Sequence, residues 1–184
     1  MAKNWKEDRA RDYISKKIKD VETVEVLDYK RDTSLESIPT NRAYRVNAAH
    51  LYADILNLDD MLNVTEVEGE TCHKRTLRFL NLHFRAAHRA IRGAGAKRVD
   101  FHNQRLHTIV TKPYGDDSEK DRVHRAVALA QLMIDVLAQT GDADEHIPNA
   151  KVRVGIDSGA ALAVNNGRSG CSASAPLAQI WGCG

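Results

Sequence analysis

The pattern of apolar and polar positions divides the chain into runs with extended or helical periodicity. Residues 48–56 are nearly all apolar, which predicts a buried strand that turns into a helix capped by Asn57 or Asp59. Asp54 is the one carboxylate inside this run. A buried carboxylate is costly to desolvate, so it usually faces a cation, a hydrogen-bond network or a metal. The strand therefore indicates a site at Asp54, although a helix-capping role would explain this residue equally well.

Two long amphipathic helices are predicted after this strand. The first runs from Thr71, its expected cap, to Arg92, and the second runs from Ser118 to about Gly141. Both are expected to pack on a sheet through apolar faces. These faces comprise Leu77, Leu80, Phe84, Ala87 and Ile91 in the first helix, and Val123, Val127, Ala130, Ile134 and Leu137 in the second.

Alternating apolar residues predict the remaining strands. Residues 97–101 and 105–111 form a hairpin joined by an Asn-Gln pair, and residues 151–159 and 160–164 form two strands about a tight glycine turn. The predicted order is strand, helix, strand, strand, helix, strand and strand. Two helices on one face of a mostly antiparallel sheet make an α+β, ferredoxin-like architecture. This architecture hosts many functions, so it does not identify the activity.

The beginning and the end of the chain differ in pattern from the middle. A short amphipathic helix, a half-exposed strand and a loop are expected in turn at residues 8–19, 21–29 and 30–41. The segment before residue 43 is interpreted as an arm that packs on the compact domain or on a partner chain. The expected divisions are an arm over residues 1–42, a compact domain over residues 43–168 and a tail over residues 169–184.

Composition excludes several classes of protein. The formal net charge is +2, from 27 basic and 25 acidic side chains, so no global charge favours nucleic acid or an acidic membrane. Cys72, Cys171 and Cys183 are odd in number and lack CxxC spacing, which argues against a disulfide framework or a zinc site. No signal peptide or membrane-spanning run is found, so a cytoplasmic protein is expected.

Histidine and basic residues on the first long helix do not predict a separate site. His83 and His88 are five residues apart, a spacing that does not place both on one helical face for metal binding. They are expected to be solvated or locally hydrogen-bonded. The basic residues of this helix are interpreted as its solvated face; they are Lys74, Arg75, Arg78, Arg85, Arg89 and Arg92.

Two carboxylates suggest chemistry on a triphosphate. Asp54 precedes a helix start, and Asp100 lies on the following hairpin. Mg²⁺ prefers a few carboxylates together with phosphate oxygens, so Asp54, the Ile55 carbonyl and Asp100 are candidate metal ligands. Backbone amides of residues 56–60, at the helix start, are candidates for holding phosphate oxygens.

Two stretches together resemble class III nucleotidyl cyclases. Leu51-Tyr52-Ala53-Asp54-Ile55 resembles the F-A-D-I element, and residues 152–159 (Val-Arg-Val-Gly-Ile-Asp-Ser-Gly) resemble the R-x-G-I-x-x-G element. The hairpin over residues 99–110 lies between them, where that family has its metal-binding and base-reading hairpin. The fuller wording, including residues 99–107 and 165–168, looks most like the pyrimidine cyclases of bacterial Pycsar anti-phage systems.

The resemblance implies a cytosolic homodimer with sites at its interface. It implies conversion of UTP or CTP, with UTP favoured, to the 3′,5′-cyclic monophosphate and pyrophosphate, with Mg²⁺ or Mn²⁺ as cofactor. The cyclic nucleotide would activate a separate effector. Asp54 and Asp100 would be catalytic and metal-binding, with Ile55 as a third metal ligand. The nucleotide contacts would be Tyr52, Asn57, Leu58, Phe101 and Arg105.

Departures from the family pattern bear on the substrate. Purine cyclases have a glycine-aspartate pair at the hairpin turn and an adenine-reading lysine four residues earlier; these positions here hold Asn103-Gln104 and Asp100. Asp100 therefore either binds metal from a shifted register or accepts a hydrogen bond from uracil N3 or the cytosine amine. Tyr52 lies on the same strand face as Asp54 and would narrow the pocket for a single-ring base. The alternative for Tyr52 is a packed core aromatic.

The residues after Gly167 lack the strand and helix in which the family carries an asparagine and an arginine. The domain over residues 43–168 is therefore expected to be incomplete at its C-terminal end, and to bind nucleotide and metal but turn over poorly. The rival interpretations are a catalytically degenerate cyclase-like module that binds nucleotide or dimerises, and a purine cyclase. A ferredoxin-like nucleic-acid-binding domain is a third, but only Tyr52 and Phe101 would be available to stack on bases.

Overall fold

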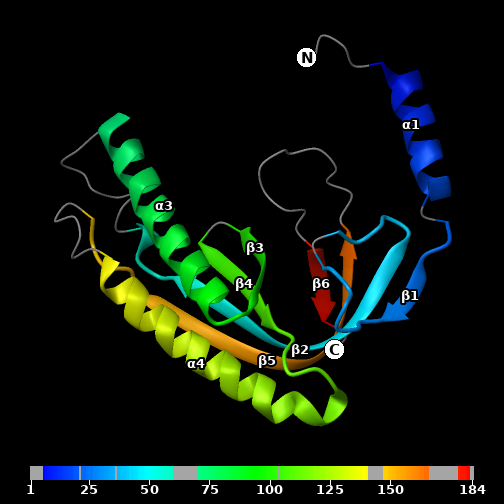
Figure 1. Cartoon of the computed structure of the whole chain (residues 1–184). Coiled ribbons are helices and arrows are strands. Elements are labelled where there is room, and N and C mark those ends of the chain that lie inside the picture. Colours follow the sequence, from blue (N-terminus) through cyan, green and yellow to red (C-terminus); the bar gives the residue numbers. More distant parts are fainter. Residues whose placement is uncertain are drawn as a thin grey trace. The chain divides into compact units, whose positions relative to one another are not determined.

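The computed structural model of the chain describes seven segments, shown in Figure 1 as coloured ribbons. Two compact units are distinguished within them. One comprises residues up to Val46 together with those from Ala161 onward, and the other comprises Asn47–Ala160. The described segments are residues 6–20, 22–35, 37–59, 70–102, 104–140, 147–165 and 178–182.

From α1 to α4 the helices and strands follow the order expected from the sequence. The expected strand, helix, strand, strand, helix order is confirmed from β2 to α4. The elements are α1 (Glu7–Asp20), β1 (Glu25–Asp28), β2 (Arg42–Ile55), α3 (Glu70–Gly93), β3 (Lys97–His102), β4 (Arg105–Val110), the 3₁₀ helix η1 (Asp116–Ser118), α4 (Glu119–Ala138), β5 (Val152–Asn165) and β6 (Ala178–Gly182).

The larger unit contains a sheet with the strand order β3-β4-β2-β5. Strands β2 and β4 are antiparallel, with Asp54 opposite Arg105. Strands β3 and β4 are also antiparallel, with His102 opposite Arg105 and a register shift between Arg98 and Asp100. The predicted hairpin of residues 97–111 is therefore confirmed, while Asn103 at its turn lies outside the described residues.

Helices α3 and α4 lie side by side on one face of this sheet (Figure 1). Alternate side chains of β2 point toward them and enter a common core with the helices. This confirms the α+β architecture with both helices on one face. The β2 residues in the core are Ala49, Leu51, Ala53 and Ile55, and the helical ones include Phe79, Ala87, Ile91, Ala126, Leu129, Met133 and Leu137.

The buried faces of both helices are rotated from the predicted ones. Leu77 is 65% exposed and Val127 is 52% exposed, whereas Phe79 and Met133 are fully buried. A helix that carries apolar residues on more than one side allows neighbouring stripes, and tertiary packing selects between them. The selected stripe on α3 includes His83, whose Nδ1 donates to the Phe79 carbonyl and whose Nε2 lies 2.6 Å from Thr140 Oγ1. Of the two alternatives expected for His83, local hydrogen bonding is confirmed and exposure to solvent is wrong.

Strand β5 corrects the prediction of two strands about a glycine turn. It continues unbroken from Val152 to Asn165. Gly159 lacks the positive φ of Gly95 and Gly115, so its backbone passes straight through the expected turn. An isolated glycine permits a turn but does not require one, and the β-branched residues Val152, Val154 and Ile156 favour an extended strand.

The smaller unit contains the N-terminal helix and strand and the end of the chain. Strand β1 pairs in parallel with the first part of β2, and ion pairs join Arg42 to Glu25 and Arg45 to Asp28. Helix α1 confirms the helix predicted for residues 8–19. Strand β6 is antiparallel to the end of β5, so the expectation that no strand follows Gly167 is wrong. β6 carries neither asparagine nor arginine.

Candidate functional site

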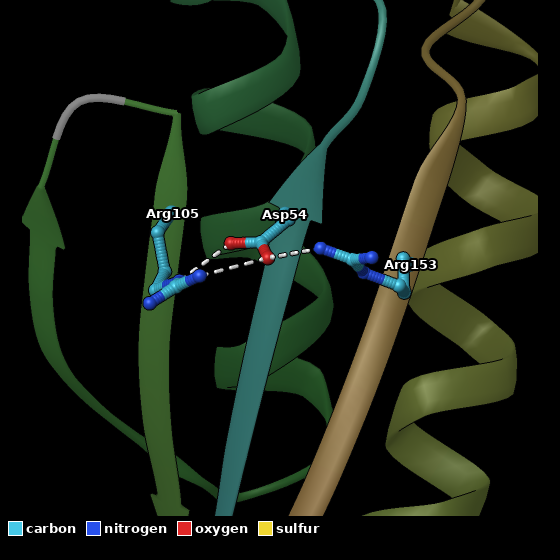
Figure 2. Close-up of polar contacts among 3 residues, drawn as sticks. All are labelled: Asp54, Arg105 and Arg153. Carbon is cyan, nitrogen blue, oxygen red and sulfur yellow. Dashed lines mark hydrogen bonds and ion pairs between the residues drawn. The ribbon is translucent and has the colours of Figure 1, made fainter.

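Asp54 lies at the end of β2 and is held by two arginines from the neighbouring strands. Arg105 on β4 donates from Nε to Asp54 Oδ1 over 2.6 Å and from Nη2 to Oδ2 over 3.1 Å. Arg153 on β5 donates from Nη2 to Oδ2 over 3.4 Å. Figure 2 shows the carboxylate between the two guanidinium groups, one on each side. The charge of the buried carboxylate is therefore compensated by cations. Both of its oxygens accept from guanidinium groups, whereas a helix-capping aspartate would accept from backbone amides.

The two arginines keep Asp54 ionised. The hydrogen bond from Arg105 lowers the pKa of Asp54 most, burial opposes this, and Arg153 lowers it further. The Asp54 side chain is 13% exposed, whereas those of Arg105 and Arg153 are 59% and 69% exposed. The buried carboxylate is thus covered by two cations that an anionic ligand in solution can reach.

Strand alternation places several more polar side chains on the side of the sheet opposite α3 and α4, which we call the open face. His50 and Tyr52 precede Asp54 by four and two residues, so all three point to this face. Cross-strand partners share a face, which adds residues from β4 and β3. The open face of the larger unit therefore carries His50, Tyr52, Asp54, Asp100, Arg105, His107 and Arg153.

Asp54 and Asp100 lie on the same face of the sheet. Asp54 is opposite Arg105, and Asp100 is opposite His107, two residues along the same strand β4. The two carboxylates are therefore separated by one strand and one step of the side-chain repeat. This arrangement satisfies the geometric condition that a shared site for both residues requires.

Phe101 is not brought to the open face. It follows Asp100 directly, so it points to the opposite side, where its ring centroid lies 4.4 Å from that of Phe84. The Arg98 guanidinium lies 5.3 Å from its centroid. Adjacent strand residues cannot both face one site, and this parity excludes Phe101 from a nucleotide contact next to Asp100.

The segment after β2 is tied to the start of β5. The Leu56 amide donates to the Lys151 carbonyl over 2.7 Å, so it is not free to hold a phosphate as predicted. The Asn57 side chain is buried; its Nδ2 donates to the Asn149 carbonyl and its Oδ1 accepts from the Lys151 amide. Asn57 therefore links two segments through its side chain rather than presenting that side chain to solvent.

Leu58 and Ile55 belong to the same connection. Leu58 begins a helical turn and packs against the core, and residue 60, the end of the predicted phosphate cradle, lies outside the described residues. The Ile55 side chain is in the core and its amide donates to the Gln104 carbonyl. Only the backbone of these two residues is therefore available to a ligand.

Three functional candidates were missed in the sequence: His50, His107 and Arg153. Tyr52 stacks on His107 with ring centroids 4.3 Å apart and planes inclined by 14°. Tyr52 is 38% exposed, so the alternative of a packed core aromatic is wrong. The signal that would have found the histidines is the period of two in His-x-Tyr-x-Asp at residues 50–54, with Arg-x-His opposite it.

A divalent cation bound on the open face would have few protein ligands. Among the residues that the structure describes, no group of three or more His, Cys, Asp or Glu side chains is clustered as a metal site. Mg²⁺ is usually bound by one or two carboxylates together with substrate phosphates. Asp54 and Asp100 on one face, with the Ile55 carbonyl at the end of β2, fit this kind of site.

Comparisons with known proteins identify the fold. No protein-family model matches the chain. The chain is 64% identical over 172 residues to a Pseudomonas aeruginosa protein named uridylate cyclase, covering 92% of the chain and 34% of that protein. It is 34% identical over 139 residues to a uridylate cyclase of a Rhizobium species, covering 75% of the chain and 27% of that protein.

A solved structure agrees with these relatives. It is a class III adenylyl cyclase-like ATP-binding protein from Pseudomonas aeruginosa, with a TM-score of 0.84 and 60% identity, covering 98% of the chain and 37% of that protein. The chain has the class III nucleotidyl cyclase fold. The resemblance seen in the sequence, including its closeness to pyrimidine cyclases, is thus confirmed, and the chain spans about a third of the length of its relatives.

Within the described segments, no helix combines the length and apolar character needed to cross a bilayer.

Proposed function

We propose that this class III cyclase domain takes part in converting UTP, or alternatively CTP, to its 3′,5′-cyclic monophosphate and pyrophosphate. The observation that carries the proposal is the Asp54 centre: a buried carboxylate with two accessible arginines on the open face of a cyclase fold. The name of the 64% identical relative, uridylate cyclase, supports a pyrimidine substrate.

The charges of the site suit a triphosphate and a metal together. Arg105 and Arg153 are exposed cations that can bind phosphate oxygens, and Arg is well suited to forked contacts with phosphate. Asp54, Asp100 and the Ile55 carbonyl would hold Mg²⁺ or Mn²⁺, which would supply charge stabilisation at the α-phosphate and the leaving group. Backbone N–H groups at Asn57 and Leu58 are the remaining candidates for phosphate contacts.

The proposed reaction is an in-line displacement within one nucleotide. The ribose 3′-oxygen bonds to the α-phosphorus, the bond from this phosphorus to the bridging oxygen breaks, and pyrophosphate leaves. The 3′-hydroxyl proton passes to bound water. The arginines would orient the triphosphate and neutralise the charge that grows on pyrophosphate, so they act mainly through positioning and electrostatics.

The base is proposed to lie near Tyr52 and Asp100. Both residues are in the cross-strand row of His107, one on each side of it. Asp100 would accept a hydrogen bond from uracil N3–H or from the cytosine amine, and Tyr52 would limit the width of the pocket. The two proposed roles of Asp100, metal ligand and base reader, are alternatives that use the same face of the sheet.

Wider aspects of the proposal follow the family resemblance. We propose a cytoplasmic homodimer, since class III sites form at a dimer interface and an isologous pair would contain two of them. The cyclic nucleotide would activate a separate effector in anti-phage defence. These proposals depend on the activity itself, so the activity is tested first.

The test is the product spectrum of the intact protein. It is incubated with Mn²⁺ and each of ATP, GTP, CTP and UTP, and cyclic nucleotides are measured by mass spectrometry. Cyclic UMP, or cyclic CMP, is expected as the main product. Cyclic AMP as the main product would refute the pyrimidine assignment.

A second candidate function is nucleotide binding without cyclisation. It is favoured by the name of the 60% identical solved structure, an ATP-binding protein that is adenylyl cyclase-like. Saturable binding of ATP or UTP with no cyclic product from any of the four nucleotides would support this candidate over the cyclase.

A further inference from the structure

Three rings lie next to one another on the open face. They begin two residues before Asp54 on β2 and two residues after Arg105 on β4. Tyr52 and His107 are direct cross-strand partners, and His50 is two residues before Tyr52. The Tyr52 and His107 rings are 4.3 Å apart and nearly parallel, and the His50 and His107 rings are 5.5 Å apart with an angle of 26° between their planes. His107 is therefore the middle member of a three-ring stack.

A hydrogen bond fixes this middle ring. His50 Nδ1 and His107 Nε2 are 3.3 Å apart, so one of the two nitrogens donates a proton to the other. Burial lowers the pKa of both residues, and burial followed by the neighbouring His50 lowers that of His107 to about 4. Both imidazoles are therefore neutral near pH 7, the state in which one can donate and the other accept.

The stack is anchored at one end and exposed at the other. His50 is 6% exposed, His107 is half-buried and Tyr52 is 38% exposed. An exposed tyrosine on a strand can adopt more than one rotamer. A parallel ring that is itself held by a buried neighbour restricts these rotamers before any ligand binds, and such preorganisation favours binding of the matching ligand.

His107 also connects the two residues proposed to flank the base. It is opposite Tyr52 in the β2–β4 pair and opposite Asp100 in the β3–β4 pair. A change in the His107 ring would therefore affect the side chains on both sides of it, the tyrosine and the carboxylate.

We propose that His107, supported by His50, is a positioning residue that holds the Tyr52 ring so that the open face prefers a pyrimidine nucleoside triphosphate to a purine one. The inference rests on the proposed function, because Tyr52 can select a base only if the open face binds a nucleotide. His107 acts through Tyr52 and is not itself assigned a contact with the substrate.

The test compares binding of two unreactive nucleotides. The intact protein and its variants are titrated, with Mn²⁺ present, with the α,β-methylene analogues of UTP and ATP. His107→Ala removes the stack, His107→Phe keeps a flat ring, and His124→Ala changes an exposed histidine on α4 as the matched control. The preference for the UTP analogue is expected to fall about three- to tenfold in His107→Ala, as loss of an aromatic pair implies. It should stay within about twofold of the parent in the other two variants.

An unchanged preference in folded His107→Ala would overturn the inference, and circular dichroism checks the fold. Should this variant fail to fold, His107→Leu, which fills the volume without a flat ring, replaces it with the same expectation. If the parent protein prefers the UTP analogue and His107→Ala keeps that preference, only the role of His107 is refuted and the proposed function stands. A parent protein that binds neither analogue refutes the proposed function and this inference with it.

Discussion

Arg105 and Asp54 face each other as direct partners across β2 and β4, with Arg105 Nε 2.6 Å from Asp54 Oδ1. Arg153 on β5 donates from Nη2 to the other carboxylate oxygen, Oδ2, over 3.4 Å. In the proposed function, a triphosphate would supply negative charge to the two guanidiniums while a metal supplied positive charge to Asp54. The arginines would thus neutralise the Asp54 carboxylate when no ligand is bound, and they would bind phosphate oxygens when a nucleotide is present.

Arg105→Gln is expected to change stability on the acid side. The arginines lower the pKa of Asp54 below its ordinary value of 3.8, so their stabilisation is fully present above that pH. It is lost as the pH falls from 3.8 through the lowered pKa of the folded state. Melting temperatures measured between pH 6 and pH 3 should therefore fall less steeply below pH 3.8 in Arg105→Gln than in the parent. An equally steep fall in both proteins would contradict the contribution of this pair.

His107→Phe is expected to alter stability in a different pH range. Burial lowers the pKa of His107 from 6.5 to about 4, so the unfolded chain binds a proton that the folded one excludes. The parent therefore loses stability as the pH falls from 6.5 to about 4. Phenylalanine cannot be protonated, so melts across this range should show a shallower decline in the variant. A decline of the same slope would mean that His107 is protonated equally in both states.

Asn57→Ala is expected to destabilise the connection between β2 and β5. The substitution removes two hydrogen bonds of the buried Asn57 side chain, to the Asn149 carbonyl and from the Lys151 amide. At about 0.5–1.5 kcal/mol for each bond, the free energy of unfolding should fall by about 1–3 kcal/mol. Chemical denaturation measures the free energy of unfolding. Asn81→Ala, which removes an exposed amide on α3 bonded to Arg85, is the matched control and should change it by less than about 0.5 kcal/mol. Equal effects of the two substitutions would show that the buried amide is dispensable.

Thr140→Val is expected to weaken the packing of α3 on α4. His83 is fully buried, and its Nε2 has Thr140 Oγ1 as partner at 2.6 Å. Valine keeps the shape but removes that partner, so the free energy of unfolding should fall by about 1–3 kcal/mol. The exposed Thr40→Val serves as the comparison in the same denaturation experiment. No difference between the two variants would indicate that water replaces the hydroxyl.

Local periodicity was sufficient to predict most of the fold. The apolar run at residues 48–56, the hairpin and the two long helices are all present, because each has a repeat that matches its secondary structure. The boundary of β2 was less predictable, since its first residues pair with β1 and their pattern is partly polar. The extended backbone at Gly159 was also not predictable, because a glycine permits either a turn or a continuous strand.

The site was only partly predictable, for geometric reasons. The cost of burying Asp54 indicated that it needs a partner, but Arg105 and Arg153 come from strands 51 and 99 residues away along the chain. No local pattern gives their register. The same register places Asp100 on the open face and Phe101 on the other, and it makes His107 the neighbour of Tyr52. The sequence thus identified chemical types, while the sheet determined which of them meet.

The most direct measurement of the central claim is the rate of cyclic UMP formation from UTP and Mn²⁺ by the intact protein and by Asp54→Asn. Asparagine keeps the size of the side chain but removes the charge that would hold a metal. The account predicts cyclic UMP from the parent and a loss of about a hundredfold or more in the folded variant. The exposed Asp135→Asn on α4 should keep the parent rate. Equal rates in the parent and Asp54→Asn, or no cyclic product from the parent, would contradict it.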